Sequence, residues 1–97
     1  MFGKRKTSLL LPTNERFDTL IGKSSEIYGR MVVGDSLRVD GKVVGNIECE
    51  DNSKVTVAIG ESGEVVGDIF AYRVMVAGKV EGNIYATERV EFHQTAD

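Results

Sequence analysis

The chain repeats the phrase Gly-Lys-Val-Val-Gly-Asn-Ile, which occupies residues 41–47. Near copies occupy residues 63–69 (Gly-Glu-Val-Val-Gly-Asp-Ile) and 78–84 (Gly-Lys-Val-Glu-Gly-Asn-Ile), and a weaker copy occupies residues 25–31 (Ser-Glu-Ile-Tyr-Gly-Arg-Met). The aligned second glycines lie at positions 29, 45, 67 and 82, so the gaps are 16, 22 and 15 residues. This interval indicates a stack of similar coils, because one such coil cannot bury its apolar face alone.

Side chains within the copies alternate as they do in strands. Val43, Gly45 and Ile47 share one parity, and the equivalent residues of the other copies do the same. Residues of one parity lie on one face of a strand. The glycine is therefore expected at an inward corner, where a Cβ would crowd the neighbouring coil. The asparagine or aspartate that follows it tolerates turn dihedrals.

Alignment of the coils predicts four columns of like side chains. Parallel coils need such columns, because each side chain lies over its equivalent at about 4.8 Å. Antiparallel hairpins fit less well, since they favour Asn-Gly or Asp-Gly turns rather than the Gly-Asn and Gly-Asp found here. The longest gap places a loop at residues 50–53. The predicted columns are Phe17–Leu37–Val55–Val74–Val90, Thr19–Val39–Val57–Val76–Phe92, Ile27–Val43–Val65–Val80 and Met31–Ile47–Ile69–Ile84.

The predicted fold is all-β: a single-domain parallel β-helix of about five short coils. It covers residues 17–93, preceded by a flexible, disordered arm at 1–16 and followed by a tail at 94–97. The single cysteine, Cys49, shares the inward parity and is expected to fill the core as a small hydrophobe. Because it has no partner for an internal disulfide, nothing indicates an oxidising compartment.

Charge is distributed unevenly along the chain. Lys4, Arg5 and Lys6 precede the first acidic residue, Glu15, which leaves 9 of the 12 basic residues against all 15 acidic ones. An acidic body does not suit nucleic acid, which needs a concentrated basic face. A basic arm on an acidic body suits an anionic surface reached by the arm alone. No apolar run approaches the length of about 20 residues that a membrane-spanning helix needs.

Three segments together resemble the bactofilins, which are bacterial polymer-forming cytoskeletal proteins. They are Leu-Arg-Val-Asp-Gly-Lys-Val-Val-Gly-Asn-Ile at residues 37–47, Thr-Leu-Ile-Gly at 19–22, and the amino-terminal Met-Phe-Gly-Lys. The resemblance covers residues 17–92 and implies a right-handed parallel β-helix of triangular section. It also implies filaments that assemble end to end without nucleotide, as a scaffold for cell-wall enzymes at the inner face of the cytoplasmic membrane. The chain departs from the family in having fewer coils and no proline-rich tails.

The tips of such a stack predict self-assembly. The first and last coils present unpaired backbone groups and open ends of the apolar columns, and solenoids that stay monomeric need polar caps. Phe17 and Ile21 at the first coil, and Val90 and Phe92 at the last, are the predicted polymerisation interface. The alternative is that both phenylalanines plug the core under the flanking arms. The residues do not decide between polar and non-polar filaments; the resemblance favours the non-polar kind.

The amino-terminal arm is the predicted membrane-targeting segment, comprising Met1, Phe2, Lys4, Arg5 and Lys6. Phe2 can enter the membrane interface while three cations meet anionic headgroups, each worth about 1 kcal/mol. Many arms on one filament would then bind by avidity. The alternative is an arm that only solubilises the chain.

No catalytic, cofactor or metal site is predicted, so an enzyme is not expected. A left-handed β-helix acyltransferase is the enzymatic alternative, because residues 59–65 look like a hexapeptide repeat. Its coils would keep a multiple of six, however, and the one histidine, His93, lies near the chain end. A monomeric binding module that docks a protein on its flat faces is the other alternative. The outward apolar residues either pair filaments, dock a partner or are ordinary surface residues: Tyr28, Val44, Val66, Phe70, Tyr72, Met75 and Tyr85.

Overall fold

Extended, half-buried segments with alternating side chains form strands throughout the body. The structure, a computed structural model, describes residues 18–50, 53–94 and 96, and these form eleven strands and no helix. Phe17 and the five predicted membrane-targeting residues lie outside that part, and the division into arm, body and tail stays a prediction. The strands are β1 (Thr19–Ile21), β2 (Glu26–Tyr28), β3 (Met31–Val33), β4 (Leu37–Val39), β5 (Lys42–Val44), β6 (Ile47–Cys49), β7 (Thr56–Ile59), β8 (Glu64–Val66), β9 (Ile69–Val76), β10 (Lys79–Glu81) and β11 (Ile84–Phe92).

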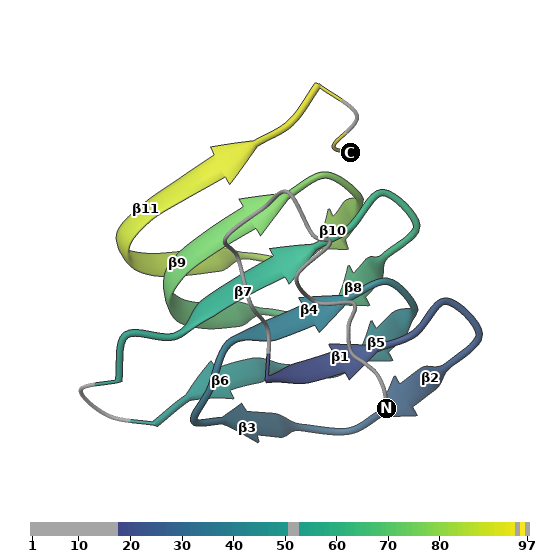
Figure 1. Cartoon of the computed structure of the whole chain (residues 1–97), viewed down its shortest axis with the longest axis horizontal. Coiled ribbons are helices and arrows are strands. Elements are labelled where there is room, and N and C mark those ends of the chain that lie inside the picture. The colour runs from purple at the N-terminus through teal and green to yellow at the C-terminus, as the bar shows by residue number, and fades with distance from the viewer. Residues whose placement is uncertain (1–17, 51–52, 95, 97) are drawn as a thin grey trace, which may run out of the picture.

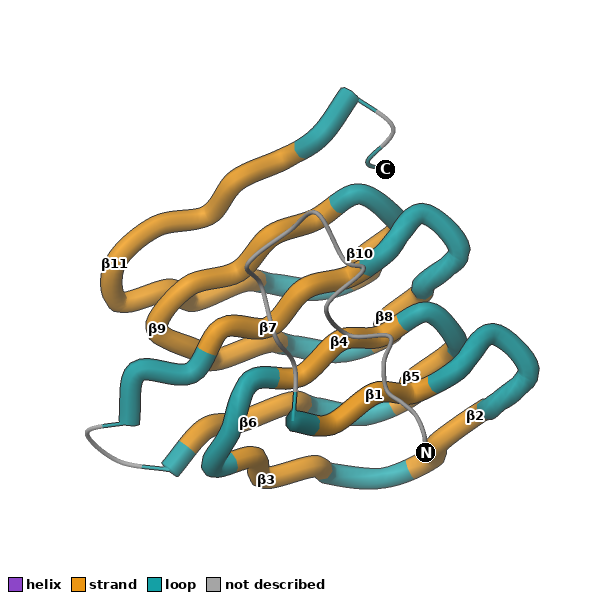
Figure 2. Tube along the Cα trace, in the orientation of Figure 1, coloured by secondary structure: helices purple, strands orange, loops and turns teal. Residues whose placement is uncertain are grey.

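The strands stack in three parallel ladders that form the sides of a β-helix (Figure 1). The first side contains β1, β4, β7 and the second halves of β9 and β11; the second side contains β2, β5, β8 and β10. The third side contains β3, β6 and the first halves of β9 and β11. Each turn crosses all three sides, as the trace in Figure 2 shows. The predicted parallel β-helix is confirmed, with four complete turns and one strand of a fifth.

Two of the four predicted columns are confirmed residue by residue. Ile27, Val43, Val65 and Val80 are register partners on the second side. Met31, Ile47, Ile69 and Ile84 are register partners on the third.

The other two predicted columns are wrong by two residues in the first and third coils. Leu37 lies beside Thr19 and Val57, not beside Phe17 and Val55. The observed columns are Thr19–Leu37–Val57–Val74–Val90 and Ile21–Val39–Ile59–Val76–Phe92.

Alternating turn lengths cause this error. The turn between the first and second sides has four residues in the first and third coils (22–25 and 60–63) but two in the second (40–41). Alignment at a constant offset cannot detect the difference, because a two-residue slip leaves every side chain on the same face. The surplus of the long gap is therefore shared between the turn at 60–63 and the loop at 50–55, rather than lying in the loop alone.

The interior is apolar along the whole stack. Leu37, Val43, Ile47, Val65 and Ile69 are completely buried, and no polar or charged residue in the described part is buried. Cys49 is a free, half-buried thiol that packs against this core. Burial of aliphatic columns therefore provides the main stabilisation.

Glycine occupies the corner between the second and third sides in every turn. Gly29, Gly45, Gly67 and Gly82 have φ between +132° and +148°, a region that other residues rarely adopt. A Cβ at any of the last three would lie under 3.0 Å from the carbonyl oxygen of the glycine one coil earlier. The predicted inward corner is confirmed.

Side-chain hydrogen bonds reinforce this corner. The backbone N–H of Asp68 donates to Asn46 Oδ1 at 2.9 Å, and the N–H of Asn83 donates to Asp68 Oδ1 at 2.9 Å. The side chains of Asn46 and Asp68 thus join successive coils.

Candidate assembly interface

The carboxyl-terminal tip ends in a strand that is paired on one edge only. Residues 89–92 of β11 pair with β9, and no other strand in the described part of the chain pairs with them. Phe92 is 65% exposed, although it continues the column that contains the fully buried Val76. Val90 is half-buried against the core. This tip therefore presents an uncovered phenylalanine at the end of a filled column.

The amino-terminal tip consists of β1, β2 and β3, each of which pairs with one described strand, in the second turn. Four of the exposed large apolar residues belong to this first turn: Leu20, Ile27, Tyr28 and Val32. Ile27 is inward-facing, since it begins a column, and its 37% exposure contrasts with complete burial of Val43 above it.

Ile21, which the sequence placed at this tip, lies in the core with 6% exposure. Its part in an end contact stays a prediction. Of the four exposed residues of the first turn, only Ile27 ends an inward column, and it was missed as a tip residue. The first member of any column has no neighbour below it. The predicted column that begins at Ile27 therefore already indicated that Ile27 lies at the tip.

Polar contacts fix the residues around this tip. Arg30 donates from Nε and Nη2 to Glu48 Oε1 at 3.0 and 2.8 Å, which joins the first turn to the second. The hydrogen bond lowers the pKa of Glu48 and raises the pKa of Arg30 from their ordinary values. The Tyr28 hydroxyl donates to Glu26 Oε1 at 2.7 Å, and this bond raises the pKa of the phenol.

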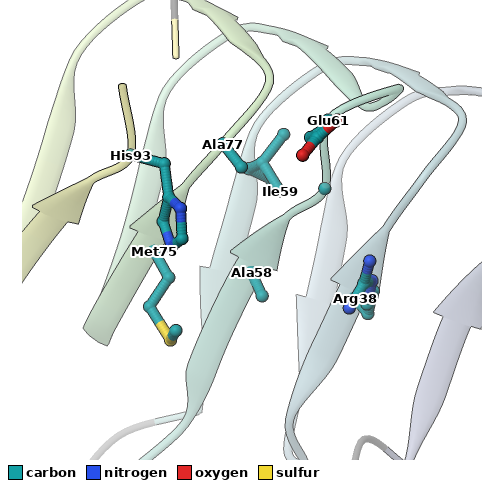
Figure 3. Close-up of a pocket in the computed structure, with 8 residues that line it drawn as sticks. Arg38, Ala58, Ile59, Glu61, Met75, Ala77 and His93 are labelled. Atoms are coloured by element: carbon teal, nitrogen blue, oxygen red, sulfur yellow. The ribbon is translucent and has the colours of Figure 1, made fainter. Parts of the chain in front are cut away.

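A hollow of about 220 Å³ lies on the outer face of the first side (Figure 3). Its walls include His93 beside Met75, with Arg38 further along the face. Catalysis by a histidine base needs a nucleophile or a fixed partner within hydrogen-bond reach. The lining contains no serine, threonine or cysteine: Arg38, Ala58, Ile59, Gly60, Glu61, Met75, Ala77 and His93. No hydroxyl or thiol nucleophile therefore lines the hollow beside His93.

Neither a cluster of metal-ligating side chains nor a membrane-spanning helix occurs in the described part of the chain. No group of three or more histidine, cysteine, aspartate or glutamate side chains lies close enough there to hold a metal ion. No helix among the described residues is long and apolar enough to cross a membrane.

A parallel β-helix that exposes an apolar column-end residue at each tip, Ile27 and Phe92, defines a class of solenoid suited to stacking on its own copies. Comparison with known protein families agrees with a solenoid that assembles with its own copies. The family described as "Bactofilin: Polymer-forming cytoskeletal" matches residues 19–97. The chain therefore belongs to the bactofilin family of polymer-forming cytoskeletal proteins.

Two curated relatives come from Myxococcus xanthus (strain DK1622). Bactofilin BacO is 33% identical over 88 residues, which cover 91% of this chain and 62% of the relative. Bactofilin BacP is 35% identical over 74 residues, which cover 76% of this chain and 29% of the relative. The chain thus spans less than two thirds of the length of either protein. No solved structure matches the chain significantly.

Proposed function

We propose that this protein is a scaffold subunit that assembles end to end, without nucleotide, into cytoskeletal filaments. The observation that carries the proposal is the state of the columns: they are filled through the body, and each tip exposes a column-end residue. Phe92 and Ile27, at opposite ends of the stack, are exposed, whereas the column members between the ends are buried. Contact between tips would extend both the apolar core and the strand ladders.

Burial of the exposed surface of Phe92 is not sufficient by itself to hold two subunits together. If a phenylalanine side chain offers about 200 Å², roughly 130 Å² of Phe92 stays in water, since 65% of the residue is exposed. Burying that area would contribute about 3 kcal/mol at about 25 cal/mol per Å². Association costs at least about 4 kcal/mol in lost freedom. The remaining contribution must come from the other column ends and from strand pairing, so a flat contact across the whole tip is required.

A Phe92→Arg variant tests the end contact. An arginine there would bring an unpaired charge into an apolar interface, which costs several kcal/mol and exceeds the gain worked out above. We expect the circular dichroism of the fold to be retained and filaments to disappear from electron micrographs and high-speed pellets.

Phe70→Arg is the matched control, because Phe70 is an exposed phenylalanine on the outer face of the third side, stacked on Tyr85. It should keep its filaments. Normal filaments from Phe92→Arg would show that this residue is not part of the end contact. A monomeric wild-type protein at high concentration in sedimentation velocity would support the binding-module alternative instead.

Membrane association is proposed from the amino-terminal arm, which lies outside the described residues. Three cations and Phe2 support weak binding to anionic lipid by each subunit, and a filament multiplies it. The filaments would then lie at the inner face of the cytoplasmic membrane. Deletion of residues 1–8 should leave polymers intact and abolish their flotation with anionic liposomes, with phosphatidylcholine liposomes as the control. Equal flotation of the deleted and the full-length chains would show that the arm does not bind the membrane.

A scaffold of this kind would act by position rather than by catalysis. The family is a cytoskeletal one, which supports this role. We propose that the filaments recruit cell-wall enzymes or other scaffold proteins and so influence cell shape. A purified peptidoglycan enzyme should co-pellet with filaments and stay in the supernatant with Phe92→Arg. Its absence from the filament pellet would contradict recruitment of that enzyme.

A further inference from the structure

The outer face of the second side carries a ladder of alternating charge. Glu26, Lys42, Glu64 and Lys79 are register partners on the successive strands β2, β5, β8 and β10. Their neighbours along each strand point into the core, so these four side chains point outward. Figure 1 shows these strands one above another along one side of the stack.

A second outward column runs beside the charged one. Tyr28, Val44, Val66 and Glu81 occupy the same four strands two residues later. Tyr28 and Glu81 are exposed, and the two valines are half-buried. The side therefore has one charged column and one largely apolar column, both open to solvent among the described residues.

Part of this pattern acts within the chain. Opposite charges on adjacent strands stabilise a ladder by roughly 0.2–1 kcal/mol for each pair. Lys79 also pairs with Glu81 at 3.2 Å, and both side chains are about half exposed. Exposed ion pairs of this kind contribute little and rearrange easily. They leave the charges able to face a second molecule.

The order of charges along the stack lets this column pair with the same column of a second copy that is turned upside down. A two-fold axis along the strand direction keeps each column opposite itself and inverts the order of the four strands. Glu-Lys-Glu-Lys then faces Lys-Glu-Lys-Glu, so every charge meets its opposite. In the other column Val44 faces Val66 of the second copy, and Tyr28 faces Glu81 of the second copy.

The other two-fold arrangement is unfavourable. An axis parallel to the stack would set the charged column against the Tyr28 column, which buries charges against apolar side chains without partners. We propose that a second copy of this chain packs on the second side, antiparallel, through these two columns. The surface thus pairs two filaments laterally.

The size of the surface makes pairing depend on polymerisation, so the inference rests on the proposed function. Four strands at about 4.8 Å by three residues at about 3.3 Å give about 200 Å² for each copy. A stable complex buries about 800 Å² on each partner. Isolated subunits should therefore not pair through this side. Filaments should, because many identical contacts act together.

Charge reversal tests the pairing. Lys42→Glu sets two glutamates opposite glutamates in each contact, and Glu64→Lys sets lysines opposite lysines. Each variant alone should keep its filaments in the high-speed pellet and lose the bundles that pellet at low speed. An equal mixture of the two preformed filaments should bundle again, because each reversed position then meets its opposite in the other filament.

Two controls separate this explanation from simpler ones. The double variant Lys42→Glu/Glu64→Lys restores opposite charges between copies but sets like charges side by side within each chain. Bundles from this variant would therefore show that the charges act between molecules rather than within one. Lys54→Glu and Glu88→Lys make the same changes in net charge at exposed positions outside the second side. Both should bundle as the wild type does. Wild-type bundles should disperse as salt rises from about 0.05 to about 0.5 M, since screening shortens the reach of the charges.

Several results would overturn the inference. They are normal bundling by both single variants, failure of the mixture to bundle, or loss of bundles equally in the Lys54→Glu and Glu88→Lys controls. Single wild-type filaments at low salt would overturn it as well. If no filaments appear in the high-speed pellet, the proposed polymer is contradicted. The lateral pairing is then contradicted as well, because it depends on filaments.

Discussion

Alanine substitutions at three glycines would separate the two physical reasons for glycine at the corner. Gly67 has a φ of +148° and lies against the carbonyl oxygen of Gly45. Gly29 has a φ of +132°, but an added Cβ would meet nothing within 4 Å, because this glycine belongs to the first turn. Gly22 has neither feature. The three variants differ only in which constraint the added methyl group meets.

The expected losses follow from these constraints. Backbone strain at positive φ costs about 1–3 kcal/mol, and alanine returns about 0.4–1 kcal/mol by restricting the unfolded chain. Gly29→Ala should therefore lower the free energy of unfolding by about 1–2 kcal/mol. Gly67→Ala adds the displacement of a packed carbonyl, typically about 1–3 kcal/mol, for a total of about 2–5 kcal/mol. Gly22→Ala should change stability by less than about 1 kcal/mol.

Urea unfolding followed by circular dichroism measures these differences. The series is best made in the Phe92→Arg background and repeated at a second protein concentration, so that any stabilisation by association is visible. A loss of about 2–5 kcal/mol is a large part of the free energy of unfolding, which is roughly 5–15 kcal/mol in small proteins. Melting should follow the same order, since about 1 kcal/mol shifts the midpoint by about 4–8 °C in a domain of this size.

The refuting outcomes are specific. Equal losses for Gly67→Ala and Gly29→Ala would show that close approach between coils adds nothing to the backbone constraint. A Gly67→Ala protein as stable as Gly22→Ala would refute the corner interpretation itself.

Two further predictions concern the core and the first turn. Ile69→Ala removes a completely buried side chain and should lower the free energy of unfolding by about 2–5 kcal/mol. Ile27→Ala, at the exposed end of a column, should lower it clearly less in the same urea experiment. Equal losses would contradict the described tip. The Arg30 hydrogen bond lowers the pKa of Glu48, so the stabilisation should be present above the ordinary value of 4.5 and be lost as pH falls through the lower folded value. Arg30→Met should remove that part of the acid dependence of the melting temperature, and an unchanged dependence would exclude the pair as its source.

Much of the architecture could be predicted because its causes are local. Alternation of side chains indicates a strand, and recurrence of Val-x-Gly-x-Ile indicates that the strands lie over one another. Val43 and Ile47 could be assigned to their columns because the glycine corner always separates those two positions by the same number of residues. A backbone constraint that only glycine satisfies left a visible mark in every copy.

The tips could be predicted only in part. Phe92 was found from its place in the sequence, and the structure shows it exposed. Ile21 was expected at the open end of the stack and is buried, while Ile27 is exposed. Exposure at an end depends on how the turns arrange the three sides, and the parity of one strand does not contain that information.

The sequence by itself determined the strands, the glycine corner and two of the columns, since each depends on residue type at short range. Only the tertiary structure decided the register of the first side, the exposed residues at each tip and the order of charges on the second side. Turns of four and two residues leave the same side chains inward. The choice between them shows only when neighbouring coils are in place, because a strand's neighbours come from residues 15 to 22 positions away.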